Sequence, residues 1–307
     1  MENVILQTRS IVKSYGHFKA LDNISITLQK GHIYGFIGEN GAGKTTLMRI
    51  LTGLSLPTAG SYSLFERENH KGMQHIRKRI GSTIEEPALY PDFSAYRNME
   101  LQRILIGNPD KSTCDELLKL LDLYDVRDKK VRNFSMGMKQ RLSIALTLVG
   151  KPELLILDEP INGLDPKNIS SLRTLLKKLN EERGITMLIS SHILNELYLL
   201  ATDYIIIHKG KIMESLSHEE LEAKCENYVK VCTDSLPQCI TVIEKELGIL
   251  DYKVIDDNTL HIYAYTKEPQ KISQALTRNN IVIGELSVCG QSLEEYFLSL
   301  TGGRRND

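Results

Sequence analysis

The segment that decides the fold is Gly38-Glu39-Asn40-Gly41-Ala42-Gly43-Lys44-Thr45-Thr46, which fits the pattern G-x-x-x-x-G-K-[ST]. It follows Ile33–Ile37, a short apolar run typical of a buried strand, and residues 44–53 have the spacing of a helix. Strand, glycine-rich loop and helix is the context in which this pattern binds phosphate. The sequence therefore predicts a nucleotide phosphate site on an α/β sheet.

The residue types in this loop suit phosphate chemistry. Glycines let backbone N–H groups approach phosphate oxygens, and the helix N-terminus adds its positive end. We expect Lys44 to reach the β- and γ-phosphates and the Thr45 hydroxyl to bind Mg²⁺. The alternative, an ordinary glycine turn before a helix, is disfavoured by the Lys-Thr-Thr ending. The predicted nucleotide-binding residues here are Gly38, Glu39, Asn40, Gly41, Ala42, Gly43, Lys44, Thr45 and Thr46.

Two acids end a second predicted buried strand, Leu154–Leu157. Asp158 is suited to hold Mg²⁺ through water, and Glu159 can polarise an attacking water as a general base. His192 follows the next predicted strand, and we expect it to touch the γ-phosphate and to hold the water and Glu159 in line. Two solvated acids at a strand end are the alternative, which the phosphate loop upstream disfavours.

Residues 133–140, Asn-Phe-Ser-Met-Gly-Met-Lys-Gln, begin a predicted helix. Ser135 is suited to cap its N-terminus, and Gly137 lets backbone approach a phosphate. The phosphate loop, Glu85, this segment, the two acids and His192 follow one another along the chain. That set, in this order and spacing, resembles the ATP-binding subunit of an ABC transporter.

The resemblance implies further roles. Ser135 and Gly137 would contact the γ-phosphate that the other subunit holds, and Asp165, in a segment similar to the family's D-loop, would lie at the dimer seam. Tyr15 stands where the family stacks an aromatic ring on adenine, because such a ring offers an apolar face to a base. The helix-opening segment departs from the family's commonest letters at Phe134, Met136 and Met138.

Glu85 is the most discriminating departure from the family pattern. The family usually has a glutamine there, which binds Mg²⁺ and links the site to the membrane permease; a carboxylate can also bind Mg²⁺. The glutamate variant resembles ATPase subunits of the bacitracin-resistance and lantibiotic-immunity type. Just after Glu85, apolar and aromatic residues predict the permease contact, the alternative being that they only pack the helical insert. They are Leu89, Tyr90, Phe93 and Tyr96.

The order of predicted elements indicates two domains. Residues 1–217 are expected to form an ABC nucleotide-binding domain of the P-loop NTPase class, α/β, with a mostly parallel core sheet and an antiparallel β portion. Residues 87–150 show helical spacing without strands, which predicts a helical insert. Residues 218–303 predict a small α+β appendage, and residues 304–307 a polar tail.

Bulk composition excludes several classes of protein. The 307 residues are 41% hydrophobic and 25% charged with a net charge of −1, so no global field favours nucleic acid. No run of 18 or more apolar residues occurs, and the N-terminal stretch carries charges, unlike a signal peptide. The five cysteines form no C-x-x-C pair and predict reduced thiols. Any membrane role is expected to come through a partner.

These expectations combine into one predicted function. Two copies of the chain would sandwich two ATP with Mg²⁺ and drive an integral-membrane permease from the cytoplasmic face, as a peptide-antibiotic exporter. The alternatives are an exporter of another substrate or a soluble ABC ATPase. The single cassette and the lack of sustained heptads disfavour the ribosome-acting and DNA-repair classes. Glu159 and His192 disfavour a regulator without turnover.

Overall fold

The structure, a computed structural model, describes residues 4–68, 73–85, 88–225, 227–290 and 293–302. It divides into two compact units, Met1–His218 and Glu219–Asp307, which are described separately below. The domain limits expected from the sequence, 1–217 and 218–303, stay predictions, and the predicted tail at 304–307 lies outside the described residues.

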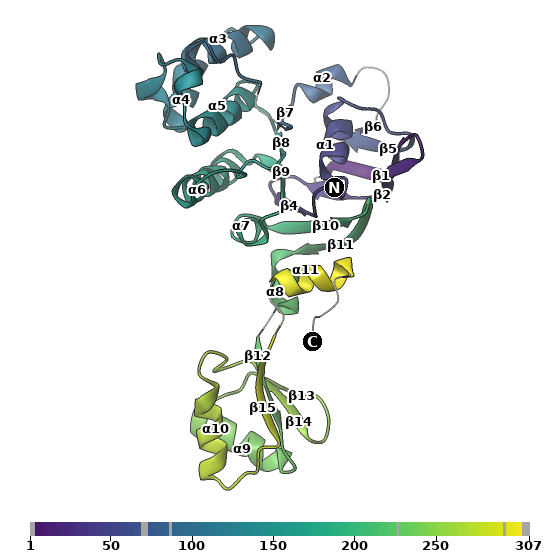
Figure 1. Cartoon of the computed structure of the whole chain (residues 1–307), viewed down its shortest axis with the longest axis vertical. Helices are drawn as coiled ribbons and strands as arrows, with labels where there is room; N and C mark the ends of the chain where they lie inside the picture. The colour runs from purple at the N-terminus through teal and green to yellow at the C-terminus, as the bar shows by residue number, and fades with distance from the viewer. Residues whose placement is uncertain (1–3, 69–72, 86–87, 226, 291–292, 303–307) are drawn as a thin grey trace. The chain divides into compact units, whose positions relative to one another are not determined.

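A six-stranded sheet forms the core of the first unit (Figure 1). Neighbouring strands run parallel except for the last pair, β10 and β11, so the predicted mostly parallel core is confirmed. Helices cover both faces of such sheets, which explains the unbroken apolar runs of its central strands. The order is β11 (Lys211–Ser217), β10 (Asp203–His208), β4 (Ile33–Ile37), β9 (Thr186–Ser191), β8 (Leu154–Leu157) and β7 (Ile80–Thr83).

Three helices connect these strands and place their N-termini at the carboxyl ends of the strands. They are α1 (Lys44–Thr52) after β4, α6 (Pro166–Arg183) after β8, and α7 (Leu194–Tyr198) after β9. In open parallel sheets, ligands bind at this edge. The phosphate loop, the two acids and His192 all follow such strands, so the topology brings them to one edge.

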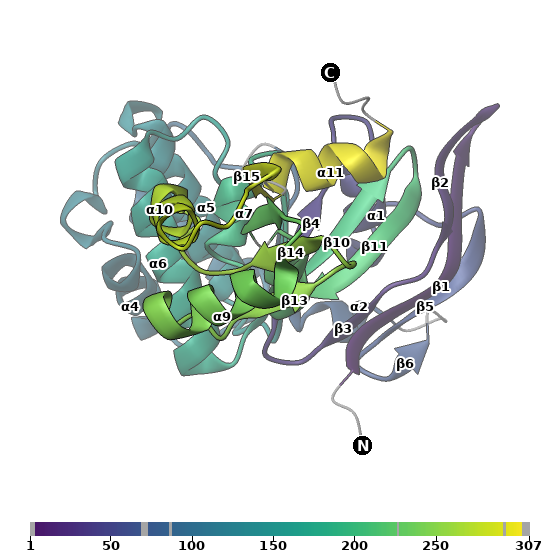
Figure 2. The same cartoon turned by 90° about the horizontal axis from the view of Figure 1, so that it is seen from below.

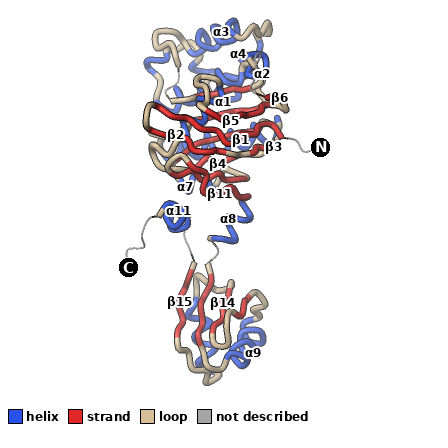
Figure 3. The backbone as a smooth tube through the Cα atoms, turned by 90° about the vertical axis from the view of Figure 1, so that its right-hand side faces the viewer, coloured by secondary structure: helices blue, strands red, loops and turns tan. Residues whose placement is uncertain are grey.

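An antiparallel sheet is the second layer of this unit and contains the first strand of the described chain (Figure 3). Figure 2 shows it on one side of the core sheet, with the helical insert on the other. Its path is β2 (Phe18–Ile24), β1 (Val4–Tyr15), β5 (Ala59–Leu64) and β6 (Arg67–Glu68), and β3 (Thr27–Gln29) also pairs with β1.

Residues 24–28 alternate apolar and polar side chains, a pattern that predicts a single strand. The structure differs, because β2 ends and β3 begins within these residues. Asn23, the last residue but one of β2, has a positive φ of 56°. The Thr8 hydroxyl then donates to the carbonyl of Ile24 and accepts from the backbone N–H of Ile26. A side chain thus takes over two bonds that a regular ladder would make.

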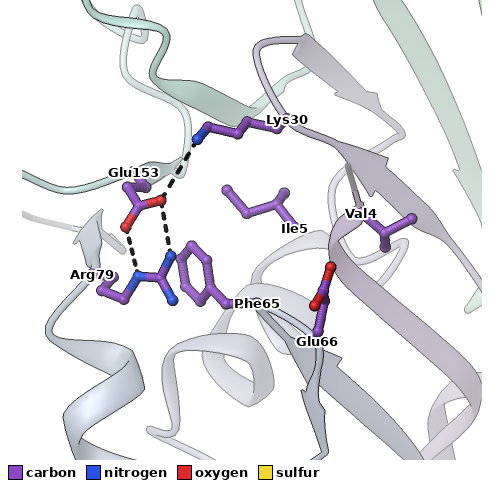
Figure 4. A pocket seen from close by; sticks show the side chains of 7 residues that line it. All are labelled: Val4, Ile5, Lys30, Phe65, Glu66, Arg79 and Glu153. Carbon is purple, nitrogen blue, oxygen red and sulfur yellow. Dashed lines mark hydrogen bonds and ion pairs between the residues drawn. The ribbon is translucent and has the colours of Figure 1, made fainter. Parts of the chain in front are cut away.

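An ionic cluster joins the two layers at the amino ends of β7 and β8 (Figure 4). Arg79 binds both carboxylate oxygens of Glu153, at 2.6 and 2.9 Å, and its guanidinium lies 3.8 Å from the centre of the Phe65 ring. Lys30 adds a longer ion pair to Glu153, at 4.0 Å. These residues line a pocket of about 280 Å³ at the strand edge opposite the phosphate loop.

The predicted helical insert contains α3 (Ala95–Leu105), α4 (Ser112–Leu120) and α5 (Met136–Leu148), while its first residue, 87, lies outside the described residues. Helix α5 packs closely on β7, because a Cβ on Gly81 would lie 2.7 Å from the carbonyl oxygen of Thr147. The hydroxyls of Thr83 and Ser143 lie 3.0 Å apart, which bonds β7 to α5. A short helix, α2 (Gln74–Arg77), precedes β7.

The second unit is built on a four-stranded antiparallel sheet with its own core. Its strand order is β13 (Tyr252–Val254), β14 (Thr259–Ile262), β12 (Tyr228–Cys232) and β15 (Glu285–Cys289). Helices α9 (Leu236–Leu247) and α10 (Pro269–Arg278) bury their apolar sides on it. The predicted α+β character is confirmed, while β15 and the helices α8 (His218–Lys224) and α11 (Leu293–Thr301) extend it. The five cysteines are free.

Candidate active site

The phosphate loop joins β4 to α1 and depends on glycine at both ends. Gly43 has φ 112°, and a Cβ there would lie 2.8 Å from the carbonyl oxygen of Ala20. At Gly38, a Cβ would lie 2.6 Å from the carbonyl oxygen of Ile207. The loop backbone is therefore packed against β2 and β10, leaving the N-terminus of α1 to face outward as an anion site.

Lys44 begins α1 and is nearly buried, with 5% of its surface exposed. Its Nζ donates to the carbonyl oxygen of Gly38 at 2.6 Å and lies 3.4 Å from Glu159 Oε1. An ammonium group held this close to the loop backbone is placed for oxygens bound by the loop. This is the position that the sequence predicts for a phosphate-binding lysine.

Asp158, at the end of β8, joins the loop to β9 through two hydroxyls. Its Oδ2 accepts from Thr45 Oγ1 at 2.7 Å, and its Oδ1 accepts from Ser190 Oγ at 2.5 Å. The Ser190 hydroxyl in turn accepts from the backbone N–H of Glu159 at 2.8 Å. A hydroxyl beside a nearly buried carboxylate is a set of oxygen ligands that fits Mg²⁺.

Glu159 and His192 form a pair at the same edge. His192 Nδ1 lies 2.8 Å from Glu159 Oε2, so the imidazole orients the carboxylate. The other oxygen, Oε1, is buried and has no hydrogen-bond partner among the described residues. It lies 3.4 Å from Lys44 Nζ, and its lone pairs are available to accept a proton from an incoming water. Glu159 also adopts a positive φ of 49°, a strained backbone of the kind found at functional sites.

Tyr15 and the loop line a common pocket of about 290 Å³ that also contains Lys44, Thr45 and Glu159. Tyr15 is 49% exposed, and Lys13 Nζ lies 5.0 Å from the centre of its ring. An exposed aromatic face in the phosphate pocket is suited to stack on a base.

Phe18, which the sequence analysis did not single out, lines the same pocket and is 65% exposed. It pairs with Tyr15 across the β1–β2 turn, where Gly16 has φ 57°. The signal in the sequence was the short hairpin Tyr-Gly-His-Phe, whose two-residue turn places both rings at its end.

Glu85, the third predicted Mg²⁺ ligand, is turned toward Arg49 of α1. Arg49 Nη2 donates to Glu85 Oε1 at 2.5 Å. The bond to Glu85 raises the pKa of Arg49 above its usual value. The structure thus brings Thr45 and Asp158 together, and it places the carboxylate of Glu85 in an ion pair.

Ser135 and Gly137 lie at the start of α5, against the N-terminus of α6. Ser135 caps α5 by accepting from the backbone N–H of Met138 at 3.3 Å, as predicted. A Cβ on Gly137 would lie 2.9 Å from the Asn168 side chain. Asp165 caps α6 and accepts from the Asn168 backbone N–H, which lowers the pKa of Asp165. The residues that line the pocket around Lys44 do not include Ser135, Gly137 or Asp165.

The segment after Glu85 presents aromatic side chains at the start of the insert. Tyr90 and Phe93 are exposed, and their ring centres lie 5.6 Å apart. Leu89 and Tyr96 are half-buried, so these two side chains also pack within the helical insert, which was the alternative to a permease contact. The segment is ordered by Asn98, which is buried and bonds both the N–H and the carbonyl of Tyr90. Residues 86–87 lie outside the described residues.

A groove of about 890 Å³ runs beside this segment, between β7, α3 and α5. Its lining mixes apolar and polar side chains, and among the apolar ones Leu105 is 76% exposed. Among the described helices, none has the length and apolarity that crossing a bilayer requires. Lining residues that the sequence did not single out include Leu54, Ile80, Leu105, Ile106 and Leu146.

Comparison with known proteins agrees with this site. The ABC transporter family model matches residues 21–162. The bacitracin transport ATP-binding protein BcrA of Bacillus licheniformis is 38% identical over 98% of both chains. The lantibiotic transport ATP-binding protein SrtF of Streptococcus pyogenes is 46% identical over 68% of this chain and 89% of that protein. The chain belongs to the ABC transporter family, as an ATP-binding subunit.

A solved structure supports the same assignment. An ATP-binding cassette in a dimeric, post-hydrolysis state with bound ADP and phosphate matches with a TM-score of 0.64 and 27% identity. The match covers 69% of this chain and 98% of that one. The fold is that of an ABC cassette, as the sequence predicts, and the protein is a nucleotide-binding ATPase.

Proposed function

We propose that this chain is the energy-coupling ATPase of an exporter that confers resistance or immunity to peptide antibiotics. The observation that carries the proposal is the match to a bacitracin transport protein over 98% of both chains, which includes the second unit. Glu85 supports it, because the sequence resembles this subfamily at that position. The match to a lantibiotic transport protein, which covers less of the chain, points to the same class of substrate.

The geometry supports the following division of labour for ATP and Mg²⁺. Lys44 and the loop N–H groups would bind the phosphates, and Tyr15, with Phe18, would hold the base. Thr45 and Asp158 would hold Mg²⁺, which supplies charge neutralisation between the β- and γ-phosphates. Glu159 would accept the proton of the attacking water, while His192 keeps its carboxylate oriented.

The active species would be a pair of copies with shared sites. Ser135 and Gly137 are placed outside the pocket of their own chain, and a twofold pair would let each chain complete the site of the other. Asp165 would lie at the seam between the copies. The matched solved cassette is dimeric, in agreement with this arrangement.

The partner would be an integral-membrane permease, so the chain would act at the cytoplasmic face of the membrane as a peripheral subunit. The groove beside β7 is lined in part by apolar side chains, and Tyr90 and Phe93 are exposed in the segment that follows Glu85. Exposed aromatic and apolar side chains of this kind support a partner site here. A photo-crosslinking residue at position 90, 93 or 105 should give a product with the permease. Position 250, which is more exposed than any of these three but lies in the second unit, is the control.

Antibiotic tolerance tests the proposed function. The chain should be expressed in a sensitive host with the membrane proteins encoded beside its gene, and the minimum inhibitory concentrations of bacitracin and a lantibiotic measured. Tolerance should rise with the parent and not with Glu159→Gln, at equal protein levels. If the purified parent hydrolyses ATP but neither antibiotic is better tolerated, the exporter has another substrate.

A further inference from the structure

One side of helix α1 carries two polar residues a single turn apart. Thr45 and Arg49 are related by i, i+4 spacing, which places them on one face of the helix. Thr45 donates to Asp158 at 2.7 Å, and Arg49 donates to Glu85 at 2.5 Å. The two residues therefore hold the carboxylates that follow β8 and β7, respectively.

The Arg49–Glu85 pair is accessible to solvent. The side chain of Arg49 is 39% exposed and that of Glu85 is 59% exposed. Ion pairs with such exposure contribute little to stability, because water competes with both partners. A second cation can therefore displace the guanidinium at modest cost. Arg49 lies one turn along α1 from Thr45, whose hydroxyl donates to Asp158, so the guanidinium is on the same face of the helix as the oxygens that fit Mg²⁺.

We infer that Arg49 is a positioning residue that competes with Mg²⁺ for the carboxylate of Glu85, and so sets the Mg²⁺ concentration at which nucleotide binds. The inference rests on the proposed nucleotide site and concerns its regulation. While Arg49 holds Glu85, this carboxylate is withheld from the metal.

The competition between Arg49 and Mg²⁺ requires a glutamate at position 85. A glutamine could accept a hydrogen bond from Arg49 but would have no charge to pair with it. A glutamate without a counter-charge would add a negative charge beside bound phosphates, which is unfavourable. Arg49 removes that penalty, and in return it makes the release of Glu85 depend on another cation.

A titration of Mg²⁺ tests the inference by binding rather than by activity. The protein carries Glu159→Gln to suppress turnover, and a fluorescent ATP analogue at fixed concentration reports binding as Mg²⁺ is added. In Arg49→Gln, the Mg²⁺ midpoint should fall about two- to fivefold, the range that an exposed ion pair supports. Arg49→Lys keeps the positive charge but loses the planar guanidinium with its fixed pair of donors, so it should shift the Mg²⁺ midpoint less.

Two controls make the test specific. In a Glu85→Gln background, Arg49→Gln should leave the midpoint unchanged, since the competition has been removed. Arg97→Gln opens another exposed pair, Arg97–Glu100 on α3, and should have no effect. An unchanged or higher midpoint in Arg49→Gln, or a shift that persists with Glu85→Gln, overturns the inference while leaving the proposed function intact. A parent that binds no nucleotide at any Mg²⁺ concentration contradicts the proposed function itself.

Discussion

Replacing Glu159 by glutamine should separate nucleotide binding from hydrolysis. Glutamine has the same shape, and its amide oxygen can still accept from the backbone N–H of His192, which lies 3.4 Å from Glu159 Oε2. The loop contacts of Lys44 to Gly38 are untouched. What is lost is the basic oxygen Oε1, buried beside Lys44 without a hydrogen bond among the described residues.

The size of the effect follows from that chemistry. Loss of a positioned general base lowers turnover about 10²–10⁴-fold. This corresponds to about 2.7–5.4 kcal/mol of transition-state stabilisation. Affinity for ATP should change by less than about threefold, because no group that contacts the phosphates is removed. Replacing His192 by alanine in the same protein should add little further loss, because the two side chains act as a unit.

Two measurements on purified protein check this prediction. Phosphate release gives turnover, and fluorescence of an ATP analogue gives affinity. Sedimentation with ATP and Mg²⁺ should show a dimer that persists in Glu159→Gln and not in Lys44→Ala, which should lose nucleotide affinity. Turnover of Glu159→Gln within about threefold of the parent would refute its role as general base.

Three other substitutions and measurements follow from the described contacts. Gly43→Ala should abolish nucleotide binding and lower the free energy of unfolding in urea by about 1–3 kcal/mol. The reason is that the new Cβ would lie 2.8 Å from a carbonyl oxygen of β2. The control Gly184→Ala, which has open space around its Cβ, should lower the free energy of unfolding less and keep nucleotide binding. Burial raises the pKa of Cys239 from 9.0 to about 11, so its alkylation at pH 8 should be slow until the protein is unfolded, and stability should fall as pH rises above 9.0. Arg79 lowers the pKa of Glu153 below 4.5, so their pair stabilises the fold above that value and is lost in acid. Arg79→Gln should therefore flatten the fall in melting temperature between about pH 5 and pH 3. An equally steep fall in that variant would contradict this attribution.

The sequence predicted those parts of the site that depend on short local patterns. The glycines of the phosphate loop, the acids after Leu154–Leu157 and His192 each follow a buried strand. Because parallel strands align their carboxyl ends, their order along the chain sufficed to bring them together. Ser135 was likewise predicted as a cap from its place before a helical pattern.

Contacts between distant segments could not be predicted in this way. Arg49 and Glu85 are 36 residues apart, and their pairing depends on how β7 lies beside α1. Thr8 interrupts the alternation at 24–28 through bonds to a neighbouring strand, which no pattern within 24–28 encodes. The groove beside β7 draws its lining from several elements, so only the fold reveals it.

The second unit shows the same limit. Strand β15 (Glu285–Cys289) has no fully buried residue and lies at the edge of its sheet, so its apolar signal is weak. It is defined by its pairing with β12, from Tyr228↔Cys289 to Cys232↔Glu285. By contrast, β12 and β14 alternate buried and half-buried residues, the pattern that a half-covered sheet produces.

The attachment of Tyr90 to Asn98 has a mechanical consequence. Asn98 lies one turn inside α3, is 2% exposed, and bonds Tyr90 at both its N–H and its carbonyl. It also donates to the carbonyl of Ser94, the cap of the same helix. The backbone of Tyr90 is therefore tied to the first turn of α3, so a displacement of one would be opposed by the other.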